Sequence, residues 1–166
     1  MKIISVLYLF FFTGFFIDGA KAQGLFDFGG EATTQYNRGK LEQDSGNFKE
    51  AVRWYKKAIE TEPRHYESYN NIGFIYGSNG YHRKAVEWYK KSIQVNPKFV
   101  QGLSNLGASY IELGKENLAV DVLKKARVLD PESQLVANNY ATALRGVGRI
   151  EESIAILKSI KNEEDP

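Results

Sequence analysis

The chain has 166 residues, of which 43% are hydrophobic and 25% are charged, and its formal net charge is +2. These values are typical of an ordinary soluble chain with one domain. A charge so near neutrality argues against a dedicated nucleic-acid binder, which would carry a clustered basic excess. Because cysteine is absent, the sequence excludes disulfides, thiolate metal sites and the cysteine-linked lipid anchor of bacterial lipoproteins.

Residues 1–22 have the pattern of a secretory signal peptide. Lys2 precedes the uncharged, mostly apolar residues 3–17, and the small-residue sequence Ala20-Lys21-Ala22 follows. This apolar run is short for a membrane span, which takes about 20 residues, but it fits the core of a signal peptide. We expect cleavage after Ala22, a linker over 23–31, and export to the periplasm or secretion; a retained membrane anchor is the alternative. The sequence has no Asn-x-Ser/Thr sequon, which fits a bacterial envelope protein.

A spacing of 34 residues organises the remainder of the sequence. It separates the prolines Pro63, Pro97 and Pro131. Four further columns of glycine, small or large apolar residues keep the same spacing: Gly46, Gly80, Gly114 and Gly148; Gly39, Gly73, Gly107 and Ala141; Ala51, Ala85, Ala119 and Ser153; Tyr55, Tyr89, Leu123 and Leu157. Such a period predicts a stack of similar supersecondary units. The units are 32–65, 66–99, 100–133 and 134–166.

These columns resemble the tetratricopeptide repeat, a 34-residue helix-turn-helix unit, most clearly in "NIGFIYGSNGYHRKAVEWYKKSIQVNP" and "NLGASYIELGKENLAVDVLKKARVLDP". The resemblance covers residues 32–166. It implies an all-α fold in which antiparallel helix pairs stack into a right-handed α-solenoid superhelix.

The residues of the second unit favour a helix pair on physical grounds as well. Tyr69, Ile72 and Tyr76 follow the i, i+3, i+7 spacing of one buried helical stripe. Gly80 can end that helix in the left-handed conformation, and Pro97 ends the next helix because proline cannot continue one. Small residues should let the paired helices approach closely: Gly73, Ala85 and Ser92.

The two ends of the array differ in polarity. Unit one has Gln35 and Arg38 where unit two has Tyr69 and Ile72, which predicts a polar cap on the outer helix. The last helix carries the apolar residues Ile154, Ile156, Leu157 and Ile160. Arrays of the family that this sequence resembles commonly close with an extra helix, and none is visible here. We expect a second copy, giving a homodimer, or a partner to cover this face; inward packing against unit four's first helix is the alternative.

The sixth residue of every unit is asparagine: Asn37, Asn71, Asn105 and Asn139. At this phase of the first helix, away from the buried stripe, the side chains should line the concave side of the superhelix. In several peptide-binding members of the family, asparagines in this column grip peptide backbone, because one amide offers both an acceptor and donors. The resemblance implies the same use here. The alternative is hydrogen bonding between helices.

Other side chains on the same face are expected to provide selectivity: Tyr36, Lys40, Asn70, Phe74, Ser104, Ile111, Asn138, Thr142 and Arg145. For Phe74 and Ile111 a core position is the alternative, since groove and core phases differ by one residue. One subgroup of the family clamps chaperone carboxylates with lysine and arginine. We do not predict that ligand, because Tyr36 and Asn70 replace the lysine and Asn139 replaces the arginine.

Lysine pairs recur on the predicted second helices, at Lys56-Lys57, Lys90-Lys91 and Lys124-Lys125, with Lys158 following. They could attract an anionic surface, but a solvated helix face is the ordinary reading. Trp54 and Trp88 are candidates either for partner anchors or for packing between successive units.

No catalytic pattern is found. The only histidines are His65 and His82, and they form no H-E-x-x-H motif. The sequence predicts a non-enzymatic interaction module, without cofactor or metal, that binds a protein or an extended peptide in its concave groove outside the cytoplasm. Nucleic acid is not expected as a partner, and a membrane only through an uncleaved signal segment. The alternative is a structural subunit of an envelope or secretion complex that self-assembles or docks through its C-terminal apolar face.

Overall fold

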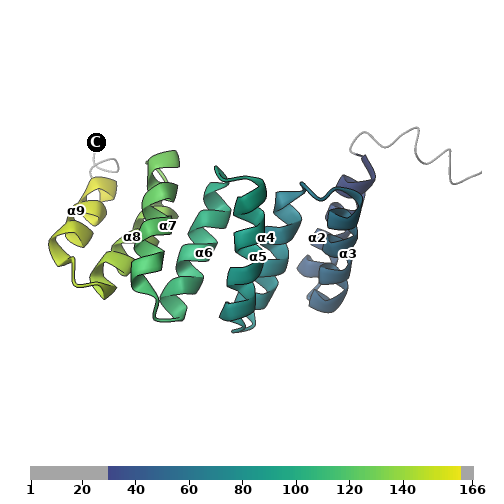
Figure 1. Ribbon diagram of the computed structural model, residues 1–166, viewed down its shortest axis with the longest axis horizontal. Coiled ribbons are helices and arrows are strands. Elements are labelled where there is room, and N and C mark those ends of the chain that lie inside the picture. Colours follow the sequence, from purple (N-terminus) through teal and green to yellow (C-terminus); the bar gives the residue numbers. More distant parts are fainter. Residues whose placement is uncertain (1–29, 162–166) are drawn as a thin grey trace, which may run out of the picture.

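Eight helices follow one another along the long axis of the computed structural model, which describes residues 30–161 (Figure 1). Successive helices form four pairs, and no strand occurs in this part of the chain, so the all-α prediction is confirmed. The predicted signal peptide lies outside the described residues. The pairs are α2 (Gly30–Asp44) with α3 (Phe48–Thr61), α4 (Tyr66–Ser78) with α5 (His82–Val95), α6 (Val100–Glu112) with α7 (Glu116–Leu129), and α8 (Gln134–Gly146) with α9 (Ile150–Lys161).

Each first helix ends in the same turn, which the glycine column makes possible. After α4, Gly80 adopts a φ of 78°, its N–H donates to the carbonyl of Gly77, and the N–H of Tyr81 donates to the carbonyl of Tyr76. This pair of bonds defines the Schellman motif, which needs a left-handed residue that glycine adopts without steric cost. The same two bonds close α2, α6 and α8, so the helical hairpins share one geometry.

The prolines end the second helices. α3, α5 and α7 each stop two residues before Pro63, Pro97 or Pro131, as expected for a residue that lacks the N–H needed to continue a helix. The next helix then begins within three residues of the proline. At α8 the hydroxyl of Ser133 accepts a hydrogen bond from the N–H of Val136, at 3.4 Å, and so caps the helix.

At its N-terminus, α2 begins at Gly30, so the last two residues of the predicted linker 23–31 are helical. Glu31 stabilises this start in two ways. A carboxylate in the first turn interacts favourably with the helix dipole, and its Oε1 accepts a hydrogen bond from Gln35 Nε2 at 3.0 Å. The predicted polar cap is found here: Arg38 is exposed and lies 3.2 Å from the Glu42 carboxylate.

Paired helices meet through glycine and a large side chain. A Cβ atom added at Gly39 would lie 2.6 Å from the ring of Tyr55, and one added at Gly107 would lie 2.4 Å from Leu123 Cγ. Both large side chains are fully buried. The expected close approach is therefore confirmed, and the second pair repeats it with Gly73 at 2.8 Å from the Tyr89 ring.

Neighbouring pairs meet mainly where the second helix of one pair packs against the first helix of the next, as α3 does with α4, α5 with α6 and α7 with α8. First helices also contact one another. α6 contacts both α4 and α8, whereas the second helices make no comparable contacts with one another within residues 30–161. Because elements on the inner side of a curved stack lie closer together, α2, α4, α6 and α8 form the inner surface. We call this surface the first-helix face. None of the described helices has the length and apolar character required to cross a membrane.

Candidate functional site

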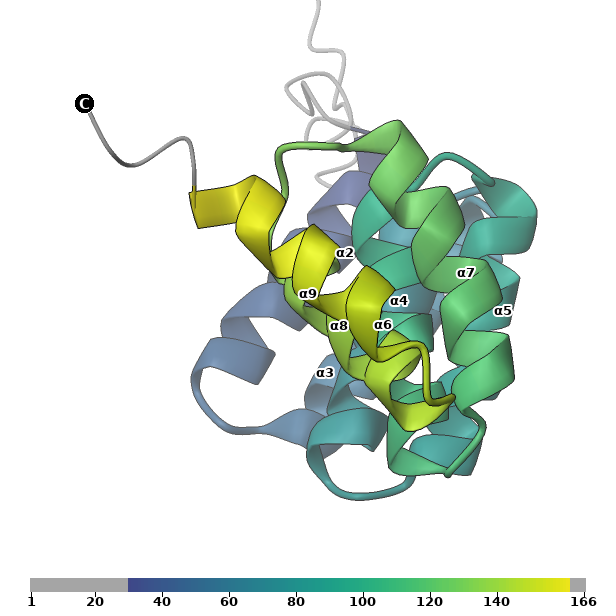
Figure 2. The same ribbon diagram turned by 90° about the vertical axis from the view of Figure 1, so that its left-hand side faces the viewer.

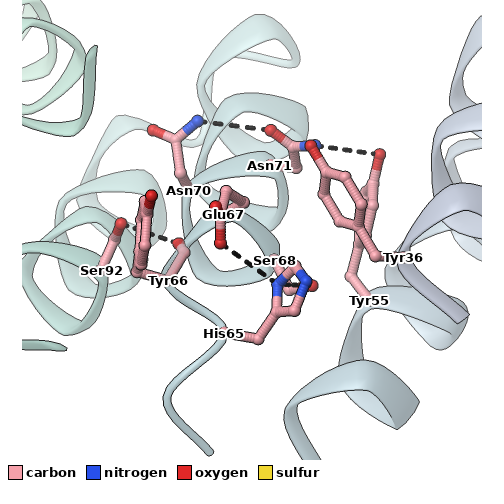
Figure 3. A network of polar contacts seen from close by, with 9 residues as sticks. All are labelled: Tyr36, Tyr55, His65, Tyr66, Glu67, Ser68, Asn70, Asn71 and Ser92. Carbon is pink, nitrogen blue, oxygen red and sulfur yellow. Dashed lines mark hydrogen bonds and ion pairs between the residues drawn. The ribbon is translucent and has the colours of Figure 1, made fainter. Parts of the chain in front are cut away.

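The adjacent asparagines of α4 are linked to each other and to the preceding repeat (Figure 3). Asn71 Nδ2 lies 3.2 Å from the hydroxyl of Tyr55 and 3.4 Å from that of Tyr36, and it donates to both. Asn70 Nδ2 donates to Asn71 Oδ1 at 3.3 Å. The pair is therefore satisfied by side chains rather than by the helix backbone, which removes the competition that makes asparagine a poor helix former.

This network continues in both directions. Asn105 Nδ2, on α6, donates to Asn70 Oδ1 at 3.1 Å, and the Tyr55 hydroxyl donates to Gln43 Oε1, on α2, at 2.9 Å. With Asn71 between them, these bonds connect five side chains across three repeats. Hydrogen bonds in such chains polarise and strengthen one another, so the network holds the repeats in register.

The junction between repeats three and four has a hydrogen bond of the same kind. Asn139 Nδ2 donates to the hydroxyl of Ser104 at 3.1 Å. In repeats two, three and four the sixth residue thus bonds to the fifth residue of the repeat before, and the helix-to-helix alternative describes these three asparagines. Asn37 differs from them because it is exposed on the outermost described helix, where none of the described residues is hydrogen-bonded to its side chain. Peptide gripping by the four asparagines stays a prediction, but the four are not equivalent.

Two residues expected on the groove surface are instead buried. Asn70 is 2% exposed and Ser104 is 1% exposed, so the expectation that they are displayed is wrong. Both occupy the fifth position, which the next first helix covers. Tyr36, at the same position, is half-buried against the rings of Tyr55 and His65. Ile111 is half-buried on the core of repeats two to four, as the core alternative states.

Five of the residues predicted to provide selectivity are displayed. Lys40 on α2, Phe74 on α4, and Thr142 and Arg145 on α8 are all exposed, and Phe74 keeps 46% of its surface accessible. The core alternative for Phe74 is therefore wrong. Asn138 is also exposed, but it lines a hollow with residues of α9 at the C-terminal end of the array.

The first-helix face is hollowed between α4 and α6. This hollow has a volume of about 180 Å³ and is lined by Phe74, Gly77, Ser78, His82, Tyr89, Asn105, Ala108, Ser109 and Glu112. Phe74 and Asn105 are among the residues predicted from the sequence, whereas the hollow itself was not predicted. The feature of the sequence that indicates the hollow is Gly77, which has no side chain at a repeat position where the other repeats have Gln43, Ile111 and Arg145.

The Tyr55 hydroxyl of the network is a neutral donor at physiological pH. Burial raises the pKa of Tyr55 to about 12, and the hydrogen bond from Asn71 offsets only part of this rise. Burial likewise raises the pKa of Tyr89. A buried phenol keeps its proton because the low-dielectric interior disfavours the phenolate.

The second helices carry the lysines and tryptophans. The first lysine of each predicted pair is exposed, while Lys57 and Lys91 lie 4.1 Å and 4.5 Å above the rings of Trp54 and Trp88. Trp88 also packs against the core cluster of the first two repeats, with its ring centroid 6.1 Å from that of Tyr69. The contact with Tyr69 lies within the second repeat, so packing of Trp88 between successive units stays a prediction.

Nothing resembling a metal site is present within residues 30–161, where no three acidic or histidine side chains converge. The ring of His65 instead contacts the Ser68 hydroxyl at 3.1 Å and the Glu67 carboxylate at 3.5 Å (Figure 3). Both contacts are made through Nδ1 of the ring, and they hold the turn between α3 and α4.

Two models of known protein families match parts of this chain. Residues 39–80 match the family model described as TPR repeat, and residues 66–99 match the one described as tetratricopeptide repeat. Among curated proteins, none matches the sequence. Three solved structures illustrate the likeness in fold, each at less than 25% identity.

YrrB, described as a TPR protein with an unusual peptide-binding site, is 17% identical with a TM-score of 0.74, over 87% of this chain and 75% of that one. The first TPR of Spaghetti (RPAP3), bound to the HSP90 peptide SRMEEVD, is 18% identical with a TM-score of 0.67, over 70% and 93%. The Sgt2 TPR domain from Aspergillus fumigatus is 19% identical with a TM-score of 0.66, over 74% and 82%.

Matching family models, a 34-residue period and four glycine-closed helical hairpins agree with one another. Proteins of this kind are generally non-catalytic interaction modules. This chain is a tetratricopeptide repeat protein, with four helix pairs in its described part.

Proposed function

We propose that this protein binds an extended segment of a partner protein along its first-helix face. The observation that carries the proposal is the surface itself. It runs over α2, α4, α6 and α8 and combines an exposed aromatic ring at Phe74 with exposed cations at Lys40 and Arg145. Two of the similar structures described above have a bound peptide or a peptide-binding site, which supports a peptide as the partner.

Amide groups on this face support backbone recognition. Asn105 and Asn139 each donate a hydrogen bond from the side-chain nitrogen to the preceding repeat. Their side-chain oxygens accept no hydrogen bond from residues 30–161. Because the nitrogen already holds each amide in place, little conformational entropy is lost when its oxygen accepts a hydrogen bond from a peptide N–H. Asn71, by contrast, has both ends of its amide engaged, so it contributes to the network rather than to the ligand.

The test compares two double variants with the wild type, using a displayed library of random 15-residue peptides as the probe. Phe74→Ala with Arg145→Ala alters the first-helix face without touching the network. Val128→Ala with Lys124→Ala is the matched control, since it removes one exposed apolar group and one exposed cation from α7.

Peptides selected by the wild type should bind the first-helix variant at least about fivefold more weakly, because a contact worth about 1 kcal/mol changes affinity by that factor. The control should bind as the wild type does. Equal binding by both variants, or failure of the wild type to select any peptide, would contradict the proposal.

We further propose that the protein acts outside the cytoplasm. Support comes from the sequence of residues 1–22, with its apolar core and small-residue cleavage site. Expression in a bacterial host followed by intact-mass measurement of the purified protein should give a chain that begins at Gln23. A chain that retains Met1 and partitions with membranes would favour the retained-anchor alternative.

A second candidate function is self-assembly through the C-terminal end of the array. Ile154 is 47% exposed and Leu157 is 39% exposed, whereas Val120 and Leu123, one repeat earlier in the same columns, are 7% and 0% exposed. Figure 2 looks onto this end, with α9 nearest the viewer. These side chains line the hollow that contains Asn138, with a volume of about 350 Å³. A second copy would bury them.

Light scattering on the wild type and on an Ile154→Asp, Leu157→Asp variant tests this candidate. The wild type should have the mass of a dimer and the variant that of a monomer, since two buried carboxylates are incompatible with an apolar interface. Ile156 is unsuitable for the test because it packs on the core of repeats two to four. A monomeric wild type would remove this candidate.

A further inference from the structure

The hollow between α4 and α6 contains two hydroxyl groups without partners. Tyr89 is 3% exposed and Ser109 is 5% exposed, and neither hydroxyl is hydrogen-bonded to any residue within 30–161. Both approach one point. A Cβ atom added at Gly77 would lie 3.6 Å from the Tyr89 hydroxyl and 4.0 Å from Ser109 Oγ. Buried polar groups are normally satisfied, so this pair calls for an explanation.

The first repeat shows what normally occupies such a site. Tyr55 stands one repeat before Tyr89 in the same column, and its hydroxyl donates to Gln43 Oε1 at 2.9 Å while it accepts from Asn71 Nδ2 at 3.2 Å. The residue that corresponds to Gln43 in the second repeat is Gly77. The site at Tyr89 therefore lacks the carboxamide that completes the site at Tyr55.

The second partner is absent as well. Asn105 corresponds to Asn71, but its nitrogen donates to Asn70 Oδ1 instead of to the tyrosine. No fully buried side-chain polar atom within residues 30–161 lacks a partner. The Tyr89 and Ser109 hydroxyls must therefore reach the outside through the hollow, which makes them accessible to a ligand.

We propose that this hollow binds the side-chain carboxamide of a glutamine in the bound segment. The amide oxygen would accept hydrogen bonds from the hydroxyls of Tyr89 and Ser109, in the manner of Gln43 in the first repeat. The amide nitrogen would donate to Asn105 Oδ1, which has no other donor among the described residues. The methylene groups would lie against Phe74 and Ala108, which line the same hollow.

The charge on the rim selects the amide over its acidic relative. Glu112 is the one carboxylate that lines the hollow, and a ligand carboxylate placed beside it would be repelled. A lysine ammonium would have to lose its hydration to reach the buried hydroxyls, which is more unfavourable than burying a neutral amide. A glutamine avoids both penalties and offers a donor to Glu112.

The inference rests on the proposed function, because it names one ligand residue for the same face. The experiment uses the displayed peptide library on the full chain and scores the residues enriched at each position. Two variants accompany the wild type. Tyr89→Phe removes one donor, and Gly77→Gln supplies from within the chain the carboxamide that the first repeat has at Gln43.

The Gly77→Gln variant should fold. The added Cβ would make only ordinary van der Waals contacts, the nearest at 3.6 Å, and glutamine is a better helix residue than glycine. Its thermal midpoint should equal or exceed that of the wild type. This measurement separates a filled site from a misfolded one.

We expect glutamine to be enriched at one position among the peptides that the wild type selects. Those peptides should bind Tyr89→Phe about fivefold more weakly, as expected for one lost hydrogen bond, and Gly77→Gln more weakly still. Replacing the ligand glutamine by glutamate should weaken binding to the wild type at least as much as replacing it by alanine.

Outcomes that overturn the inference differ from those that overturn the proposed function. The wild type could select peptides whose binding depends on Phe74 and Arg145 but which show no glutamine, or show lysine or glutamate in its place. That result would support peptide binding on the first-helix face and contradict the glutamine site. If Gly77→Gln is as stable as the wild type and binds the glutamine peptides equally well, the site also falls. If no peptide is selected, both proposals fall together.

Discussion

The junctions inside the array and the surface at its C-terminal end are built from the same columns of residues, yet their environments are opposite. Inside, Leu123 is 0% exposed and Ser104 is 1% exposed, because the next first helix covers them. At the end, Leu157 is 39% exposed and Asn138 is on the surface, because no later helix lies over them among the described residues. A residue type at a given repeat position therefore does not define a role. The presence of a following repeat does.

The largest difference between the two regions should appear on truncating the leucine column. Leu123→Ala removes a fully buried side chain and should lower the free energy of unfolding by about 2 to 5 kcal/mol. Leu157→Ala should lower it by about 1 kcal/mol or less, since much of that side chain is already in water. Chemical denaturation of both variants measures the contrast. Equal losses would mean that the C-terminal leucine is covered in solution.

Alkaline pH should destabilise the first half of the array before the second, because repeats one and two have Tyr55 and Tyr89 where repeats three and four have leucine. The pKa of Tyr55 is raised from 10.0 to about 12. Its contribution is therefore complete below pH 10 and is lost as the pH rises towards 12. For one group this loss is about 3 kcal/mol at most.

Unfolding measured between pH 9 and about 11.5 tests this dependence, with the chain handled identically at each pH. Tyr55→Phe should flatten the pH profile, since phenylalanine does not ionise, even though it removes two hydrogen bonds at neutral pH. A profile as steep as that of the wild type would show that other groups cause the alkaline loss.

Helix spacing offers a third contrast. Gly107→Ala should destabilise the third pair by about 1 to 3 kcal/mol, because the new Cβ would lie 2.4 Å from Leu123 Cγ. The fourth pair already accommodates Ala141 in this column. Gly77→Ala is the control: its Cβ has room, so helix propensity should raise stability by about 0.5 to 1 kcal/mol. Thermal melts that show no difference between the two variants would contradict the close packing at Gly107.

The smallest expected difference concerns the asparagines. Asn139→Ala removes the hydrogen bond to the buried Ser104 hydroxyl and should cost about 1 kcal/mol. Asn138→Ala should be nearly neutral, because this side chain is exposed and none of the described residues is hydrogen-bonded to it. The denaturant midpoints of the two variants measure this difference in stability. An equal loss for Asn138 would indicate that a second copy engages the C-terminal end.

Much of the fold could be predicted from periodicity. The glycine and proline columns located the ends of the helices, since those residues act locally through backbone conformation. The site could be predicted only in part. Phe74, Lys40 and Arg145 are displayed as expected, whereas Asn70 and Ser104 are buried one position away in phase. A shift of one residue turns a helical side chain by about 100°, which is enough to move it from the groove into the junction.

The sequence by itself determined the number of hairpins, their turns and the glycines at which paired helices meet, because each of these depends on residues close together in the chain. Only the tertiary structure decided how the asparagines are used and where a hydroxyl remains open. The Tyr89 site exists because a side chain is missing at Gly77 and because Asn105 turns to Asn70. Such pairings depend on which atoms of neighbouring repeats come within hydrogen-bonding distance, and that follows from packing rather than from spacing along the chain.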